Sequence, residues 1–199
     1  MKIKRFLFLS MMLLLLNNSY AQNVQQEKEF LNWFFRKHQK MNGKVFYLAG
    51  IDTDKWNYLR SAVHPDTLYA EIAPGDSIQN YRKDTLVFSE IERALLQKEI
   101  GGLKSQNLPD QFFDGGKMLS SDSLELYAKG NLDYWGNLAK NKVYRYFMFS
   151  RPIFLRANTI CVFNYSQYCG FKCASGKTAI YEKQHGRWKR LMVLSSWIS

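Results

Sequence analysis

Residues 159–194 read TICVFNYSQYCGFKCASGKTAIYEKQHGRWKRLMVL, and this stretch decides the fold. It is rich in aromatic and β-branched residues, and Gly170, Gly176 and Gly186 divide it into runs of strand length. Gln184-His185-Gly186-Arg187 favours a hairpin turn, because glycine adopts a positive φ at no steric cost. The stretch therefore predicts an antiparallel β-meander.

The meander is expected to have about four strands. Each corresponds to a run of aromatic and β-branched residues, and turn residues such as Pro152 and Asn158 separate the earlier runs. The expected strands are Val143–Phe149, Thr159–Ser166, Thr178–Lys183 and Trp188–Leu194.

A first helix is expected over residues 27–41. Apolar residues such as Phe30 and Phe34 recur there at helical spacing, and Asn42-Gly43 supplies a stop signal. His38 lies on the apolar stripe of this helix. A histidine in that position is more often packed against its neighbours than used as a ligand.

A second helix is expected after a short strand at Asp84–Phe88. Ser89 and Glu92 have the spacing of a capping box, in which hydroxyl and carboxylate each bond an otherwise unpaired backbone amide. Apolar residues at helical spacing follow, and Gly101-Gly102 is expected to end the helix.

The other segments give weaker signals, and residues 52–83 are the least informative. Strands follow helices rather than alternate with them, so the fold class is α+β, with N-terminal helices packed on the C-terminal meander. No linker is evident, so residues 22–199 are expected to form a single domain. The remaining expected elements are strands at Val45–Ile51 and Leu68–Ile72, and helices at Ser121–Lys129 and Leu132–Lys140.

The start of the chain resembles a secretory signal peptide over residues 1–21. Basic residues precede an apolar run at Phe6–Leu16, and small residues at Ser19 and Ala21 are typical of a cleavage site before Gln22. The run is shorter than the roughly 20 apolar residues of a spanning helix. We therefore expect an exported chain, periplasmic or extracellular after cleavage, with no membrane span in its mature part.

The charge balance favours anionic partners. The chain has 28 Lys and Arg against 17 Asp and Glu, and three of the basic residues lie in the leader. The mature chain then has 25 basic and 17 acidic residues, a net charge of +8. Such a surplus suits a membrane surface, an acidic polysaccharide or a nucleic acid. Because no dense basic block and no nucleic-acid motif is present, nucleic-acid binding is not expected.

The cysteines form the most distinctive constellation, Cys169-Gly170-Phe171-Lys172-Cys173, with Cys161 nearby. A disulfide needs Cα atoms about 4.4–6.8 Å apart, so the chain must bend between Cys169 and Cys173, and Gly170 permits that bend. The interval from Cys161 to Cys169 is largely extended, which disfavours their pairing. We expect a Cys169–Cys173 disulfide and a free, buried Cys161, with free thiols or a redox-active pair as alternatives.

No other motif carries recognisable chemistry. Gly176-Lys177-Thr178 resembles the end of a phosphate loop, but the spacing to Gly170 is wrong and a strand rather than a helix is expected to follow. His38, His64 and His185 are scattered, so neither a metal nor a cofactor is expected. Scattered acids could meet in the fold as a hydrolase pair, which sequence alone does not test.

A set of short motifs in the C-terminal half forms a recognisable pattern. Its residues are Phe149-Ser150-Arg151-Pro152-Ile153-Phe154, Tyr168-Cys169-Gly170, Cys173, Gly176, Gly186-Arg187-Trp188-Lys189 and Trp197-Ile198-Ser199. With this pattern the chain resembles a family of uncharacterised secreted proteins of Bacteroidota. The resemblance covers about residues 120–199 and the leader, and implies an exported α+β domain without assigning any functional residue. This chain has Cys173-Ala174-Ser175-Gly176 where the resemblance implies a second Cys-Gly pair.

These features favour a non-enzymatic module that binds a ligand or partner outside the cytoplasm. The alternative is an exported hydrolase acting on cell-wall or extracellular polymers. A third interpretation is a thiol oxidoreductase that uses Cys169 and Cys173. A pocket with convergent carboxylates or histidines would favour the enzyme, whereas an exposed apolar or aromatic patch would favour the binding module.

Overall fold

The computed structural model divides into two compact units, which are described separately. The expected signal peptide, with its cleavage site at Ala21 and Gln22, lies outside the described residues. The structure describes residues 24–41, 43–48, 53–71, 85–103, 108–120, 122, 124 and 133–199.

The first unit contains the predicted N-terminal helix. Residues 24–33 are α-helical and continue into the π-helical turn η1, Phe34–His38, so the helix both begins and ends earlier than predicted. The imidazole of His38 packs against the ring of Trp33, with centroids 5.5 Å apart, and against the ring of Phe34, with centroids 5.4 Å apart. The prediction of a packed histidine is therefore confirmed.

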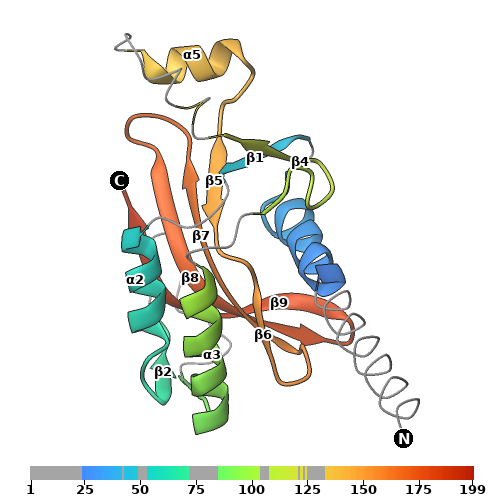
Figure 1. Cartoon of the computed structure of the whole chain (residues 1–199), viewed down its shortest axis with the longest axis vertical. Helices are drawn as coiled ribbons and strands as arrows, with labels where there is room; N and C mark the ends of the chain where they lie inside the picture. The colour runs from blue at the N-terminus through green and yellow to red at the C-terminus, as the bar shows by residue number, and fades with distance from the viewer. Residues whose placement is uncertain are drawn as a thin grey trace, which may run out of the picture. The chain divides into compact units, whose positions relative to one another are not determined.

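The second unit is built on a mixed sheet, which has seven strands among the described residues (Figure 1). The main path runs β4-β1-β5-β7-β8-β9, and β6 pairs with β7 beside it. β1 is parallel to both of its neighbours, and the remaining pairs are antiparallel. The strands are β1 Val45–Leu48, β4 Gly116–Leu119, β5 Tyr146–Phe149, β6 Ile153–Leu155, β7 Ile160–Tyr168, β8 Ala174–Gln184 and β9 Arg187–Ile198.

The predicted meander is confirmed in β7, β8 and β9. Together with β5, these are the four expected strands, and they are neighbours in the sheet. The β8–β9 turn holds His185 at φ 49° and Gly186 at φ 75°, the two positive values of a tight hairpin turn. The sheet has more strands than the four expected. β4 and β6 are too short for their sequences to show an alternation of apolar and polar residues. The parallel pairing of β1 joins distant segments and leaves no pattern in the sequence around it.

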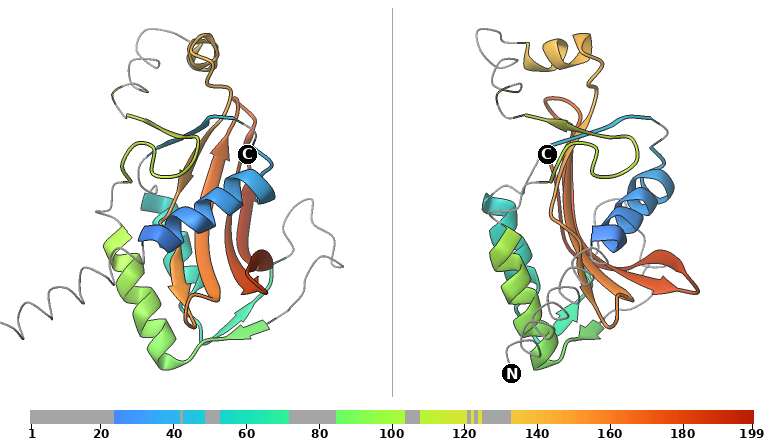
Figure 2. Two further views of the ribbon diagram at one scale, coloured as in Figure 1. Left: turned by 90° about the vertical axis from the view of Figure 1, so that its right-hand side faces the viewer. Right: turned by 45° about the vertical axis from the view of Figure 1, so that its right-hand side comes forward.

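Two helices cover one face of this sheet, α2 Thr53–Ala62 and α3 Glu90–Leu103. Figure 1 shows them side by side, and the right-hand view of Figure 2 shows both on the same side of the sheet. A small hairpin of β2 Thr67–Tyr69 and β3 Thr85–Val87 lies between them in the chain. Buried side chains of both helices, including Leu59 and Leu96, join residues of β6 to β9 in one apolar core. β2 and β3 match two predicted strands in shorter form, whereas α2 was not predicted.

The capping box at the start of α3 is confirmed. The Ser89 amide donates to Glu92 Oε2 at 2.8 Å, and the Glu92 amide donates to Ser89 Oγ at 3.3 Å. The predicted end at Gly101-Gly102 was wrong, because the helix continues to Leu103. Leu103 is buried in the apolar core, and this burial outweighs the weak helix propensity of the two glycines.

A short helix, α5 Tyr134–Lys140, precedes β5. Asp133 caps it by accepting a hydrogen bond from the Gly136 amide at 2.7 Å. This confirms the end of the helix expected over Leu132–Lys140, whereas most of the one expected over Ser121–Lys129 lies outside the described residues. None of the described helices is long and apolar enough to cross a membrane.

Candidate functional site

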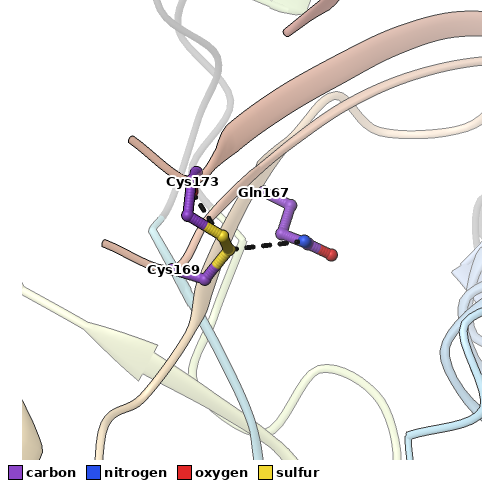
Figure 3. The surroundings of a disulfide bond; sticks show 3 residues. All are labelled: Gln167, Cys169 and Cys173. Atoms are coloured by element: carbon purple, nitrogen blue, oxygen red, sulfur yellow. Dashed lines mark hydrogen bonds between the residues drawn. A yellow bond between two sulfur atoms is a disulfide. The ribbon is translucent and has the colours of Figure 1, made fainter. Parts of the chain in front are cut away.

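The predicted Cys169–Cys173 disulfide is present, with Cα atoms 5.1 Å apart, and Cys161 is free and buried. The bond closes the turn between β7 and β8, where the Cys169 amide also donates to the Cys173 carbonyl at 2.8 Å. Gly170 has φ 152°, which side chains rarely adopt, so the bend needs glycine as expected. Figure 3 shows the Gln167 amide directed at Cys169, with Nε2 3.7 Å from the sulfur.

His185 does not lie beside the disulfide. It occupies the turn after β8, whereas Cys173 directly precedes that strand. Because β8 has eleven residues at about 3.3 Å each, roughly 35 Å separates them. His185 therefore does not contact either sulfur, and the disulfide closes the β7–β8 hairpin.

The apparent phosphate-loop ending, Gly176-Lys177-Thr178, lies within β8. All three residues pair with β7 on one side and β9 on the other. As predicted, the segment is a strand, so it offers no helix N-terminus to a phosphate group. Among the described residues, no group of three or more His, Cys, Asp and Glu side chains is placed to hold a metal ion.

A cavity of about 240 Å³ is the candidate functional site. It lies against β7, β8 and β9. Glu71, which follows β2 and Ala70 in the chain, also borders it. Most of the described lining residues have polar side chains, although apolar atoms make up the larger part of the lining surface, and one residue supplies an indole. The lining residues are Glu71, Asn164, Lys177, Thr178, Ser195, Ser196 and Trp197.

The strand register brings three of these side chains together. Asn164 pairs with Thr178, and Thr178 pairs with Ser195, so the three lie in a row across β7, β8 and β9. Directly paired residues point to the same face of a sheet. The Asn164 side-chain amide donates to Thr178 Oγ1 at 2.8 Å. A polar row thus crosses a face that elsewhere carries the apolar core.

Two groups in this row have hydrogen-bonding capacity that the described part of the chain does not use. Asn164 is only 5% exposed, and its amide oxygen accepts no hydrogen bond there. The Ser195 hydroxyl likewise makes no hydrogen bond with a described residue. The Asn164 amide oxygen and the Ser195 hydroxyl are not sealed from solvent, so a polar group of a ligand can reach them and form hydrogen bonds.

Glu71 supplies a carboxylate at the rim of the cavity. Its backbone amide donates to the Val193 carbonyl at 2.8 Å, which holds this residue against the edge strand β9. Its Oε1 accepts a hydrogen bond from Ser196 Oγ at 3.1 Å. Among the described residues that line the cavity, Glu71 is the only acid and none is a histidine.

Lys177 brings a cation to the lining of the cavity. It pairs with Ser196, whose hydroxyl donates to Glu71 Oε1. Because directly paired residues point to the same face of a sheet, Lys177 shares the face of Ser196 rather than that of Thr178. The described lining therefore combines hydroxyl and amide groups with one carboxylate and one ammonium group.

Trp197 reaches the cavity because Gly176 has no side chain. The two residues pair across β8 and β9, and a Cβ at Gly176 would overlap the indole nitrogen of Trp197. The same Cβ would lie 2.8 Å from Ser166 Oγ. The glycine thus lets the indole lie across the strand beside the polar row.

No family model, curated protein or solved structure matches the chain. The assignment of the site therefore rests on its geometry. Sequence reasoning found the disulfide but missed Asn164, Thr178 and Ser195. Each is one of several polar residues in its strand, and only the register of the strands shows that the three positions coincide.

Proposed function

We propose that this protein is a non-enzymatic ligand-binding domain that works outside the cytoplasm, with the cavity beside β7, β8 and β9 as its binding site. The observation that carries this proposal is the Asn164 amide oxygen, which belongs to a largely buried side chain in the cavity lining, stays open to solvent and accepts no hydrogen bond from a described residue. Ser195 offers a hydroxyl in the same row. Few precisely placed polar groups in a concave site are typical of ligand recognition.

The chemistry of the lining favours a small polyhydroxylated ligand such as one sugar ring. Sugar hydroxyls both donate and accept, which matches the amide of Asn164, the hydroxyl of Ser195 and the carboxylate of Glu71. The Trp197 indole offers an apolar surface to the C–H face of such a ring. The volume of about 240 Å³ suits a ligand smaller than the drug-sized molecules that occupy larger pockets.

Glycoside hydrolysis has less support in the same cavity. The reaction ordinarily needs two carboxyl groups on either side of the scissile bond. Glu71 supplies one, and no second acid lines the cavity within the described part of the chain. A binding site needs no such pair, so binding without turnover is the function that the geometry supports best.

Isothermal titration of the chain from Gln22 onward, with glucose, galactose, mannose and N-acetylglucosamine as probes, tests the proposal. At least one sugar should bind. Ser195→Leu should abolish that binding by filling the cavity, and Ser195→Ala should weaken it roughly threefold to tenfold through loss of one hydrogen bond.

Ser61→Ala is the matched control, because Ser61 is exposed on α2 and does not line the cavity. It should leave the affinity unchanged. If no sugar binds, or if Ser195→Leu binds as well as the wild type while remaining folded, the cavity is not the site of sugar recognition. Release of a cleaved product from a glycan substrate would instead favour the hydrolase.

A further inference from the structure

A second surface lies at the end of the sheet that carries the disulfide. Three large apolar side chains are mostly exposed there: Tyr144 at 67%, Phe171 at 72% and Ile198 at 64%. They come from three different segments, namely the residues before β5, the β7–β8 turn and the end of β9. This set of three is called the apolar tip below.

The strand pairing places these segments together. Tyr146 pairs with Tyr168, so Tyr144 lies near the point where β7 enters the disulfide loop. Ile198 pairs with Ser175, just after that loop. Figure 1 shows the β7–β8 hairpin, the start of β5 and the end of β9 at one end of the sheet.

The apolar tip is surrounded by positive charge. Lys140, Lys142 and Lys172 are exposed in the same segments. Within residues 133–147, 169–175 and 197–199, which the structure describes, Asp133 is the only acid, and its carboxylate already caps α5. These three segments are therefore both cationic and apolar.

We propose that the apolar tip and its lysines dock on the surface of an anionic lipid bilayer. Single projecting rings can enter the headgroup region, because a fluid bilayer requires no complementary shape, whereas lysines beside them pair with anionic headgroups. The disulfide holds Phe171 in a closed loop of five residues, which reduces the entropy lost on docking. The net charge of +8 on the expected mature chain attracts the protein to the same surface.

This inference does not depend on the ligand cavity, since Phe171 and Lys172 do not line it. The proposed contact is peripheral and requires no membrane-spanning helix, which none of the described helices could provide. Binding should therefore be reversible and should weaken as the salt concentration rises.

Vesicle flotation with the chain from Gln22 onward tests the proposal. The protein should float with vesicles of equimolar phosphatidylcholine and phosphatidylglycerol, and much less with phosphatidylcholine alone. Phe171→Ser and Lys172→Glu should each reduce binding about tenfold. In Phe171→Trp, the new indole should shift its emission to shorter wavelength when anionic vesicles are added.

Two control variants test whether any exposed apolar or basic residue has the same effect. Ile91→Ser removes an apolar side chain and Lys98→Glu reverses a charge at exposed positions of α3, and both should leave binding almost unchanged. The proposal fails if the wild type does not float, floats equally with neutral vesicles, or loses as much binding through the α3 variants. An unshifted emission of Phe171→Trp on bound vesicles would also overturn it.

Discussion

At Gly176, the absence of a side chain allows Trp197 to reach the cavity. An alanine Cβ would overlap the Trp197 indole nitrogen, so Gly176→Ala should lower the free energy of unfolding by about 1–3 kcal/mol. Because the indole must move, sugar binding should weaken as well. Urea denaturation and isothermal titration measure the two effects.

Gly101→Ala is the control for this prediction. Nothing lies within 4 Å of the position of its Cβ, and Gly101 is near the end of α3. Alanine there should raise the free energy of unfolding by up to about 1 kcal/mol through helix propensity. Equal effects of the two substitutions would show that Gly176 has no special contact with Trp197.

The ion pair between Glu92 and Arg156 gives the fold a pH dependence. Arg156 Nε lies 2.7 Å from Glu92 Oε1, and its hydrogen bond lowers the pKa of Glu92 from 4.5 to about 2, with help from the Ser89 amide. Because the pKa of Glu92 is lower in the folded than in the unfolded state, the ionised carboxylate stabilises the folded state above pH 4.5. This contribution is lost as the pH falls toward 2.

Glu92→Gln should therefore cost about 1 kcal/mol at neutral pH, since the pair is partly exposed and Gln retains the capping bonds. The difference from the wild type should shrink as pH falls and vanish near pH 2. Urea denaturation at several pH values measures it. Glu90→Gln, in the same first turn, is the control. A difference that stays constant with pH would contradict the assigned pKa.

At the scale of single residues, local chemistry was predictable and the cavity was not. The capping box of Ser89 and Glu92 and the bond between Cys169 and Cys173 join residues that are close in sequence. Asn164 and Ser195 are brought together only by the register of β7, β8 and β9. No pattern within one strand records that register.

At the scale of elements, the disulfide constrains one hairpin rather than the whole sheet. Replacing both Cys169 and Cys173 by serine should lower the free energy of unfolding by about 2 kcal/mol on the chain-entropy model for a loop of five residues. Hydrogen exchange should increase at the β7–β8 turn and little elsewhere. Urea denaturation and exchange measured by mass spectrometry check this.

Alkylation of the native protein provides the control for that interpretation. Cys161 is buried, so it should react only after the protein is unfolded. Cys169 and Cys173 are joined by the disulfide, so they should react only after reduction. Reaction of Cys169 or Cys173 without reduction would show that the bond does not form in the protein. Loss of protection throughout β8 and β9 in the double variant would mean that the bond supports the whole sheet.

Helix α3 provides a second prediction at this scale. Leu96 is fully buried in the core between the helices and the sheet, whereas its neighbour Leu95 is 40% exposed. Leu96→Ala should lower the free energy of unfolding by about 2–5 kcal/mol, and Leu95→Ala by much less. Thermal or urea denaturation compares them. Equal losses would contradict the orientation of α3.

The elements that sequence predicted best are those with strong local signals. The β8–β9 hairpin follows from Gly186, and the start of α3 from its capping box. α2 was missed because its sequence, TDKWNYLRSA, is mostly polar and shows little apolar periodicity. The parallel partners of β1 were missed because such pairing joins segments distant in the chain.

At the scale of the whole molecule, the long β-meander carries two separate features. One face supports the apolar core under α2 and α3 and then the polar row of Asn164, Thr178 and Ser195. One end carries the apolar tip with its disulfide loop. The two features allow a ligand to be bound by a protein that is held at a lipid surface.

The most direct test of the central claim is an NMR titration of the ¹⁵N-labelled chain from Gln22 onward with the sugar that binds most tightly. If the sugar binds in the cavity, the resonances of the Asn164 side-chain amide, the Trp197 indole and the backbone amides of Thr178 and Ser195 should shift. Shifts confined to other parts of the molecule, or no shifts at a saturating sugar concentration, would contradict it.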